Sequence, residues 1–120
     1  MKIKTLLLTS LLTLLIISCA DGLDESLLHG SWKTVEWKVV DTGQEINNQM
    51  DFTFDSKRRY SVDYGTEKEQ GRYWVAVDYL HTVEDGKAEK KVKIKSINSD
   101  TLQLEMNRGG RIERLVLLKQ

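Results

Sequence analysis

The residue with the clearest chemistry in the sequence is Cys19, the only cysteine of the chain. It follows residues 5–17, an uncharged run that is apolar apart from three threonines and one serine, and a short basic start with Lys2 and Lys4. This run is too short for a comfortable transmembrane helix, which needs about 20 apolar residues, but it has the length of the apolar core of a signal peptide. We therefore predict that residues 1–18 are an export signal that ends directly before a thiol.

The segment Leu15-Ile16-Ile17-Ser18-Cys19 resembles the lipobox of bacterial lipoproteins, with a branched aliphatic residue at −3, a small residue at −1 and cysteine at +1. The resemblance implies that the thiolate of Cys19 takes a diacylglyceryl group and that the chain is cut before it. A serine hydroxyl could not replace this thiolate at neutral pH. The chain would then be anchored to a membrane of the cell envelope through its N-terminal lipid, with residues 19–28 as a short tether.

The residue after the cysteine bears on the choice of membrane. Ala20 is not the inner-membrane aspartate of the enterobacterial sorting rule. This favours the outer membrane, at its periplasmic face or at the cell surface, as the expected location.

Residues that could bind a metal or catalyse a reaction are few and scattered. His29 and His81 are the only histidines, and they lie far apart in the sequence without the spacing of a metal site. No serine stands in a Gly-x-Ser-x-Gly setting, no glycine loop is suited to phosphate, and the carboxylates fall mainly in predicted turns. We expect no metal, no cofactor and no enzymatic activity.

Charge and cysteine content narrow the choice of partners. The sequence has 18 basic and 18 acidic residues, and removing Lys2 and Lys4 with the signal leaves a net charge of −2. This argues against nucleic acid as a partner, which calls for a clearly basic domain. With its one cysteine lipidated, the domain can form no internal disulfide, so its stability must come from its core.

Any binding site must be carried by short strands, because apolar and polar residues alternate from residue 30 onward, with turn residues between the runs. We expect a bulge near Lys33 and Thr34 and a break near Asp78. About eight strands are predicted, at 32–40, 50–54, 60–64, 73–83 in two parts, 91–95, 102–106 and 112–118. The predicted fold class is all-β, a small up-and-down antiparallel barrel over residues 29–120.

Residues 27–32 carry a resemblance to a known family, because a short predicted helical turn precedes Gly30-x-Trp32. This segment resembles the entry to a lipocalin barrel, and the whole chain resembles the lipocalin-like lipoproteins of Bacteroidota, which end on a strand like residues 115–119. In lipocalins a last-strand arginine packs on the first-strand tryptophan and closes the barrel floor. The resemblance implies that Gly30, Trp32 and Arg114 close the barrel here, with Arg111 as the second choice for the arginine.

The aromatic residues leave two interpretations of the interior open. In the first, which we take as the predicted function, the barrel binds a small apolar ligand without catalysis. The lining would then comprise Tyr60, Val62, Tyr64, Tyr73, Val75 and Met106. In the second, aromatic side chains fill the small interior, as eight strands permit, and short strands favour this expectation. The protein would then be a structural or interaction subunit of an envelope complex, with Trp37 and Trp74 on the outer face as a contact patch.

Overall fold

The structure is a computed structural model that describes residues 23–120. The predicted signal peptide, Cys19 and the start of the tether lie outside the described residues. A single turn of 3₁₀-helix, η1 (Glu25–Leu28), precedes eight strands. The strands are β1 (Gly30–Val39), β2 (Asp51–Phe54), β3 (Arg59–Asp63), β4 (Lys68–Ala76), β5 (Tyr79–Glu84), β6 (Glu89–Ile97), β7 (Thr101–Arg108) and β8 (Arg111–Lys119). In this part of the chain no helix is long and apolar enough to cross a membrane.

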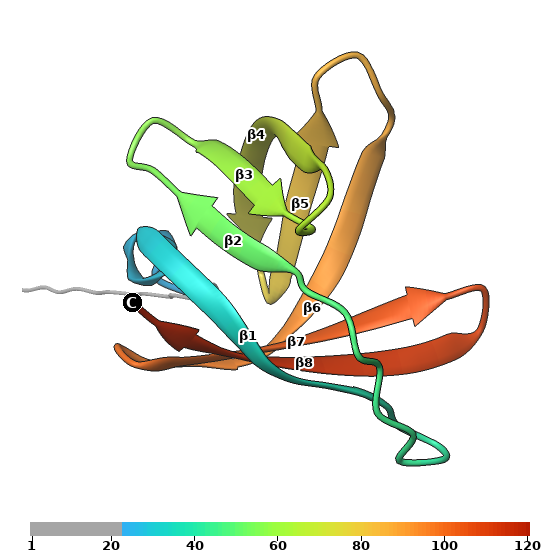
Figure 1. The fold of residues 1–120 in the computed structure, drawn as a ribbon. Helices are drawn as coiled ribbons and strands as arrows, with labels where there is room; N and C mark the ends of the chain where they lie inside the picture. Colours follow the sequence, from blue (N-terminus) through green and yellow to red (C-terminus); the bar gives the residue numbers. More distant parts are fainter. Residues whose placement is uncertain (1–22) are drawn as a thin grey trace, which may run out of the picture.

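The strands form one closed antiparallel barrel in which each pairs with the next along the chain and β8 pairs back with β1 (Figure 1). The prediction of an all-β, up-and-down barrel with about eight strands is therefore confirmed. The expected break near Asp78 is the turn between β4 and β5. The expected bulge in β1 lies between Thr34 and Glu36, close to its predicted position.

The strands run between two ends of the barrel, which we call the closed end and the open end. The closed end carries η1, the C-terminal residue and three short turns, at 55–58, 77–78 and 98–100. The open end carries the loop 40–50 and the turns 64–67, 85–88 and 109–110. In Figure 1, η1 and the C-terminus lie together on the left, and the β7–β8 hairpin and the loop 40–50 lie on the right.

The closed end is filled by large side chains. Trp32 is 1% exposed, and its indole N–H donates a hydrogen bond of 2.8 Å to the carbonyl oxygen of Leu28 in η1. Phe54 and Tyr73 pack edge to face, with their ring centroids 4.9 Å apart. Below them, four leucines on β7 and β8 are fully buried: Leu102, Leu104, Leu115 and Leu117. This half of the barrel holds a continuous apolar core.

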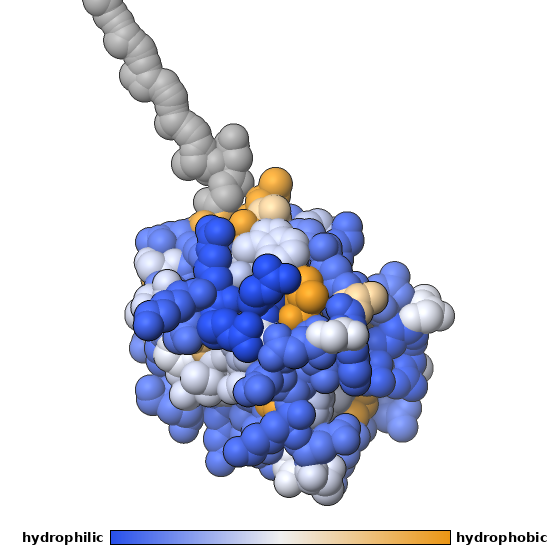
Figure 2. Space-filling model, turned by 90° about the horizontal axis from the view of Figure 1, so that it is seen from above, coloured by the Kyte–Doolittle hydropathy of each residue, from blue (hydrophilic) through white to orange (hydrophobic). Residues whose placement is uncertain are grey.

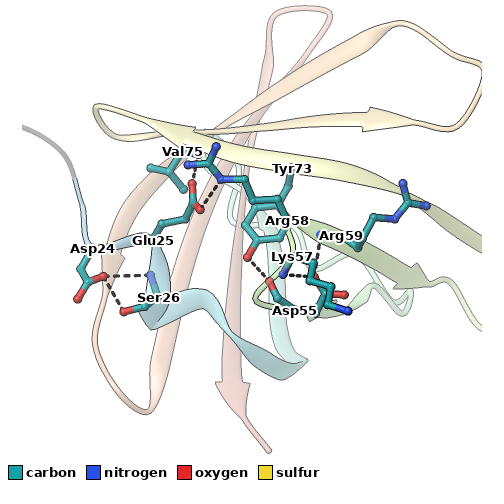
Figure 3. A network of polar contacts seen from close by, with 9 residues as sticks. All are labelled: Asp24, Glu25, Ser26, Asp55, Lys57, Arg58, Arg59, Tyr73 and Val75. Atoms are coloured by element: carbon teal, nitrogen blue, oxygen red, sulfur yellow. Dashed lines mark hydrogen bonds and ion pairs between the residues drawn. The ribbon is translucent and has the colours of Figure 1, made fainter.

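Polar contacts hold η1 in place across the closed end (Figure 3). The carboxylate of Asp24 accepts hydrogen bonds from the backbone N–H and the hydroxyl of Ser26, which caps the helix. The carboxylate of Glu25 joins the turn 55–58 and β4 to the helix, because it accepts from the guanidinium of Arg58 and from the backbone N–H of Val75, both at 2.9 Å. The helix therefore acts as a fixed plug for this end.

The cation on the barrel floor is Lys119, and the prediction of Arg114 was wrong. The ammonium group of Lys119 lies 4.7 Å from the centroid of the Trp32 ring, and the two residues face each other across β1 and β8. Arg114 is exposed on the outer face. The inward residues of β8 are those at 113, 115 and 117, whereas the prediction used the opposite parity, because 112, 116 and 118 are also apolar.

Gly30 also lies at this end of the barrel, next to the side chain of Lys119. Its φ of +121° is a backbone conformation that side chains rarely permit. A Cβ atom at this position would also stand 2.6 Å from Cε of Lys119. Gly30 therefore lets the Lys119 side chain cross over to Trp32. Arg111, the second choice for the arginine, lies at the opposite end of β8.

The outer surface offers no large apolar patch in the view of Figure 2, where most of the visible residues are hydrophilic and a small hydrophobic group lies at the upper edge. Among the described residues, the large apolar side chains that are exposed are Val35, Val40, Val77 and Leu118. Trp74 is half-buried on the outer side of β4 and stacks on His81, with ring centroids 5.2 Å apart.

Candidate functional site

A cavity of about 630 Å³ occupies the open half of the barrel. Its walls come from β1 to β7, and residues of the loops 40–50 and 64–67 stand at its rim. Ligand pockets in proteins typically enclose about 300–1,000 Å³. The interior is thus filled at the closed end and hollow at the open end, so the expectation of a filled barrel describes only one half of it.

Four of the six residues predicted as a lining border this cavity, namely Tyr60, Val62, Tyr64 and Met106. The other two lie elsewhere. Tyr73 is buried at the closed end, where its hydroxyl donates to the carbonyl oxygen of Asp55, and Val75 is half-buried beside Glu25. The reason is the direction of β4, which starts at the open end, so its later inward residues lie at the closed end.

Trp37 also lines the cavity, and the prediction that it lies on the outer face was wrong. It is 7% exposed, and its indole N–H donates a 2.8 Å hydrogen bond to the carboxylate of Glu113. The bulge between Thr34 and Glu36 explains the error, because one extra residue reverses the alternation of a strand. Trp32 before the bulge and Trp37 after it therefore both face inward, and Val35 is 55% exposed.

Charged residues of the open half were missed as site residues. Glu69, Lys90 and Arg108 line the cavity, and Glu113 is fully buried beside it. A signal for three of them was present in the sequence. Glu69 has the parity of Tyr73, Lys90 that of Ile94 and Arg108 that of Met106, so each stands where an inward apolar residue would be expected.

Glu69 is the polar centre of the cavity. The residue is 7% exposed, and its carboxylate accepts hydrogen bonds from the hydroxyls of Tyr60 and Tyr64, at 2.5 and 2.6 Å. The ammonium group of Lys90 lies farther away, at 3.4 Å. Burial by itself raises the pKa of Glu69, but the two phenol hydrogen bonds and the nearby Lys90 outweigh it and hold the pKa below its usual range. The cavity therefore contains a carboxylate that is ionised at neutral pH.

The two tyrosines remain protonated donors. Burial, and then the hydrogen bond and negative charge of Glu69, raise the pKa values of Tyr60 and Tyr64 well above their usual range. Both phenols are therefore neutral at physiological pH, so their hydrogen bonds solvate the carboxylate of Glu69 without cancelling its charge.

Glu113 forms a second buried carboxylate network, which braces the mouth of the barrel. It is 0% exposed and accepts from the indole of Trp37 and from the guanidinium of Arg111, whose nearest nitrogen lies at 2.6 Å; Arg108 adds a longer contact of 3.4 Å. Burial raises the pKa of this group, yet the Trp37 and Arg111 hydrogen bonds and the charges of both arginines lower it further than burial raises it. The network ties β1 to the β7–β8 hairpin.

The arrangement is suited to holding a molecule. No group of three or more metal-ligating side chains occurs within residues 23–120. His81 bonds Glu89 at 2.9 Å and stacks on Trp74 on the outside of the barrel. The cavity offers apolar and aromatic side chains around one buried carboxylate, with further charged side chains nearer to solvent.

Comparisons with known proteins agree with this architecture. A family model described as a lipocalin-like domain matches residues 28–104. A lipocalin-like protein from Bacteroides uniformis ATCC 8492 is similar in structure, with a TM-score of 0.60, 16% sequence identity, and coverage of 78% of this chain and 99% of its own. An uncharacterized protein from Bacteroides eggerthii DSM 20697 is similar with a TM-score of 0.59, 13% identity and the same coverage. Curated protein sequences give no match. The family match spans more than half of the chain, which therefore belongs to the lipocalin-like domain family.

Proposed function

We propose that the protein is a membrane-anchored lipoprotein whose barrel binds a small, largely apolar molecule in the cavity of its open half. The observation that carries this proposal is the cavity itself, about 630 Å³, whose wall contains aromatic and aliphatic side chains and a buried carboxylate at Glu69. Binding sites for small molecules are typically of this kind, mostly apolar with a few placed polar groups that fix orientation.

The wall supplies the main attraction for an apolar ligand. Phe52, Val62 and Leu80 are buried core residues that border the cavity, and the half-buried Met106 adds a flexible side chain to its wall. Removing apolar surface from water contributes about 25 cal/mol per Å². Because the closed end is filled, the ligand is limited to the open half, which favours a compact molecule or a short chain.

Lipidation of Cys19 would set the direction of the cavity. Leu23 donates its backbone N–H to the carbonyl oxygen of Val77 at the closed end. Four residues beyond Cys19 reach Leu23, and an extended chain of that length spans about 14 Å at most. The closed end would then face the membrane and the open end would face away from it, towards the periplasm or the cell exterior. We propose the outer membrane as the site of anchoring.

The alternative function, an interaction subunit with an outer tryptophan patch, has less support. It relied on Trp37 and Trp74 together, and Trp37 faces the cavity. Trp74 alone lies on the outer side, where stacking on His81 covers one of its faces.

The test uses a chain that begins at Asp21. The barrel closes and its core is complete within residues 23–120, so this chain keeps every contact described above. Purified from an expression host, it should carry bound apolar material that native mass spectrometry detects as added mass. Stripping that material should lower the melting temperature, because a ligand that binds only the folded state stabilises it.

A pair of tryptophan substitutions localises the binding. Met106→Trp fills the cavity and should abolish the added mass, whereas Val35→Trp, on the exposed face of β1, should retain it. Circular dichroism confirms that both variants fold. A protein of bare mass whose melting temperature is unchanged by apolar alcohols, acids, amines and quinones would overturn the proposal.

A further inference from the structure

We propose that the cavity selects organic cations, small amines with an apolar body, whose ammonium group binds Glu69 beside Tyr60 and Tyr64 in place of Lys90. This inference rests on the proposed function, since it names the ligand class of the same cavity.

The first step is the charge that the cavity presents. Glu69 is 7% exposed and borders the cavity, and its strongest partners are two neutral phenols. An ionised carboxylate can accept about four hydrogen bonds. One oxygen of Glu69 accepts from Tyr60, and the other accepts from Tyr64 and, weakly, from Lys90. The carboxylate therefore keeps both its negative charge and a vacant acceptor position.

The cation that the chain itself supplies, Lys90, forms only a weak ion pair with Glu69. The ammonium of Lys90 lies 3.4 Å from Glu69, and its side chain is 55% exposed. Charge-assisted N–H···O bonds are usually about 2.7–2.9 Å long, and ion pairs with exposed partners contribute little. Lys90 can therefore swing into solvent at small cost and leave its place to the ammonium group of a ligand.

Glu113, the other buried carboxylate, is held by closer partners than Glu69 has in Lys90. That carboxylate is held by an indole and by a guanidinium at 2.6 Å, and it does not border the cavity. Two buried carboxylates thus stand in the same half of the barrel, one sealed by the chain's own cations and one left accessible.

Aromatic side chains border the cavity that contains the Glu69 carboxylate. Tyr60, Tyr64, Trp37 and Phe52 all border the cavity, and aromatic faces attract cations. A ligand carboxylate would instead be brought close to the ionised Glu69, a like-charge contact that opposes binding. Two other cations border the cavity: Arg108, which lies 3.4 Å from Glu113, and Lys91, whose ammonium lies 4.6 Å from the centre of the Tyr79 ring. Comparison with a carboxylate ligand tests whether these cations attract an anion instead.

The experiment compares three ligands with the same ten-carbon chain. Decylamine, decanol and decanoate are titrated at pH 7 into the chain that begins at Asp21, stripped of bound material, by isothermal calorimetry. We expect decylamine to bind at least about tenfold more tightly than decanol, and decanoate to bind more weakly than decanol. Glu69→Gln should remove the preference for the amine, so that decylamine and decanol bind with similar affinity.

A neighbouring pair of lysines gives the sharper readout. Lys90→Gln removes the competing cation and should raise the affinity for decylamine several-fold, whereas Lys91→Gln, which removes a rim cation that lies over the Tyr79 ring and not beside Glu69, should raise it by clearly less. This arm decides the question even where Glu69→Gln fails to fold.

The outcomes separate the two proposals. If decanol and decylamine bind equally, if decanoate binds best, or if Lys90→Gln weakens amine binding, the amine inference is overturned and the proposed function stands. If none of the three ligands binds and the unstripped protein runs at its bare mass, the proposed function fails, and the amine inference fails with it.

Discussion

The two tryptophans of β1 mark two differently built halves of one barrel. Trp32 at the closed end donates its indole N–H to a backbone carbonyl of η1, and Trp37 at the open end donates to the buried carboxylate of Glu113. Both side chains are buried. At the closed end, the acceptor of the indole N–H belongs to the helix that also covers the core. At the open end, the acceptor belongs to a network of charged side chains beside the cavity.

The size of the inward side chains accounts for the difference. Trp32, Phe54 and Tyr73 converge beneath the Leu28 plug, and together they fill the closed end. At the level of the cavity, Val62 and Thr82 are smaller inward residues, and their partners on the neighbouring strands are the charged residues Glu69 and Lys90. A barrel of eight strands is wide enough for side chains to fill, or to hold one small ligand, and this one does each in a different half.

The comparison predicts a large difference between substitutions in the two halves. Trp32→Ala removes a fully buried side chain and should lower the free energy of unfolding by about 3–5 kcal/mol. Met106→Ala enlarges a space that already exists and should cost about 1 kcal/mol, since its side chain is half-buried. Chemical denaturation measures both values. Similar losses for the two variants would mean that the halves are packed alike.

A second prediction concerns the charged network of the open half. Glu113→Ala should lower the free energy of unfolding by about 2–3 kcal/mol, because Trp37 loses its acceptor while the exposed arginines regain water. The folded-state pKa of Glu113 is lowered, so the stabilisation is present above the pKa of the unfolded carboxyl group and is lost as the pH falls through the folded pKa.

The pH dependence supplies the control for this prediction. Denaturation midpoints measured between neutral pH and pH 3 should fall less steeply for Glu113→Gln than for the parent protein. Glu69 has a lowered pKa as well, so part of the acid sensitivity should remain in the variant. An unchanged slope would show that folding does not lower the pKa of Glu113.

The fold could be predicted because its signals are local. Alternating apolar residues and short turns recur along the chain, and each hairpin pairs neighbouring segments, so the strands and their order follow from nearby residues. The turn at Asp78 and the bulge in β1 were both visible in the sequence, and both occur.

The candidate site was harder to predict because it depends on which face of each strand points inward. The bulge was expected, yet its consequence for Trp37 depends on where the register shifts. On β8 both faces carry apolar residues, so the pattern did not distinguish Arg114 outside from Glu113 inside. Carboxylates are rarely buried without partners, so Glu69 was not expected to face inward. Its burial is explained by the hydrogen bonds from the two tyrosine hydroxyls that lie next to it in the folded barrel.

A third prediction tests whether every part of the closed end is optimised. Val77, in the turn between β4 and β5, has a φ of +59° and is 63% exposed. A β-branched residue is strained in this conformation, whereas glycine adopts it freely. Val77→Gly should therefore raise the free energy of unfolding by about 0.5–1 kcal/mol, the relief of strain exceeding the entropy lost by glycine.

The matched control is Val35→Gly, at a valine of the β1 bulge that is also exposed but whose φ is not positive. It should lower the free energy of unfolding by about 0.5–1 kcal/mol, the usual cost of glycine within a strand. Thermal melting of the two variants in parallel gives the signs. A loss of stability in both would show that the Val77 turn is not strained in solution.

The smallest expected effect is at the barrel floor, where Lys119 and Arg114 can be compared directly. Lys119→Met keeps the side chain's length but removes the ammonium over Trp32, and it should cost about 0.5–1 kcal/mol. Arg114→Met, on the exposed outer face, should change stability by less than about 0.5 kcal/mol. The decisive measurement is a double-mutant cycle in which each is combined with Trp32→Leu, which removes the aromatic ring. Lys119→Met should then be non-additive with Trp32→Leu, because residues in contact couple, and Arg114→Met should be additive with it. The reverse pattern would restore the arginine expected from the family resemblance and remove Lys119 from the floor of the barrel.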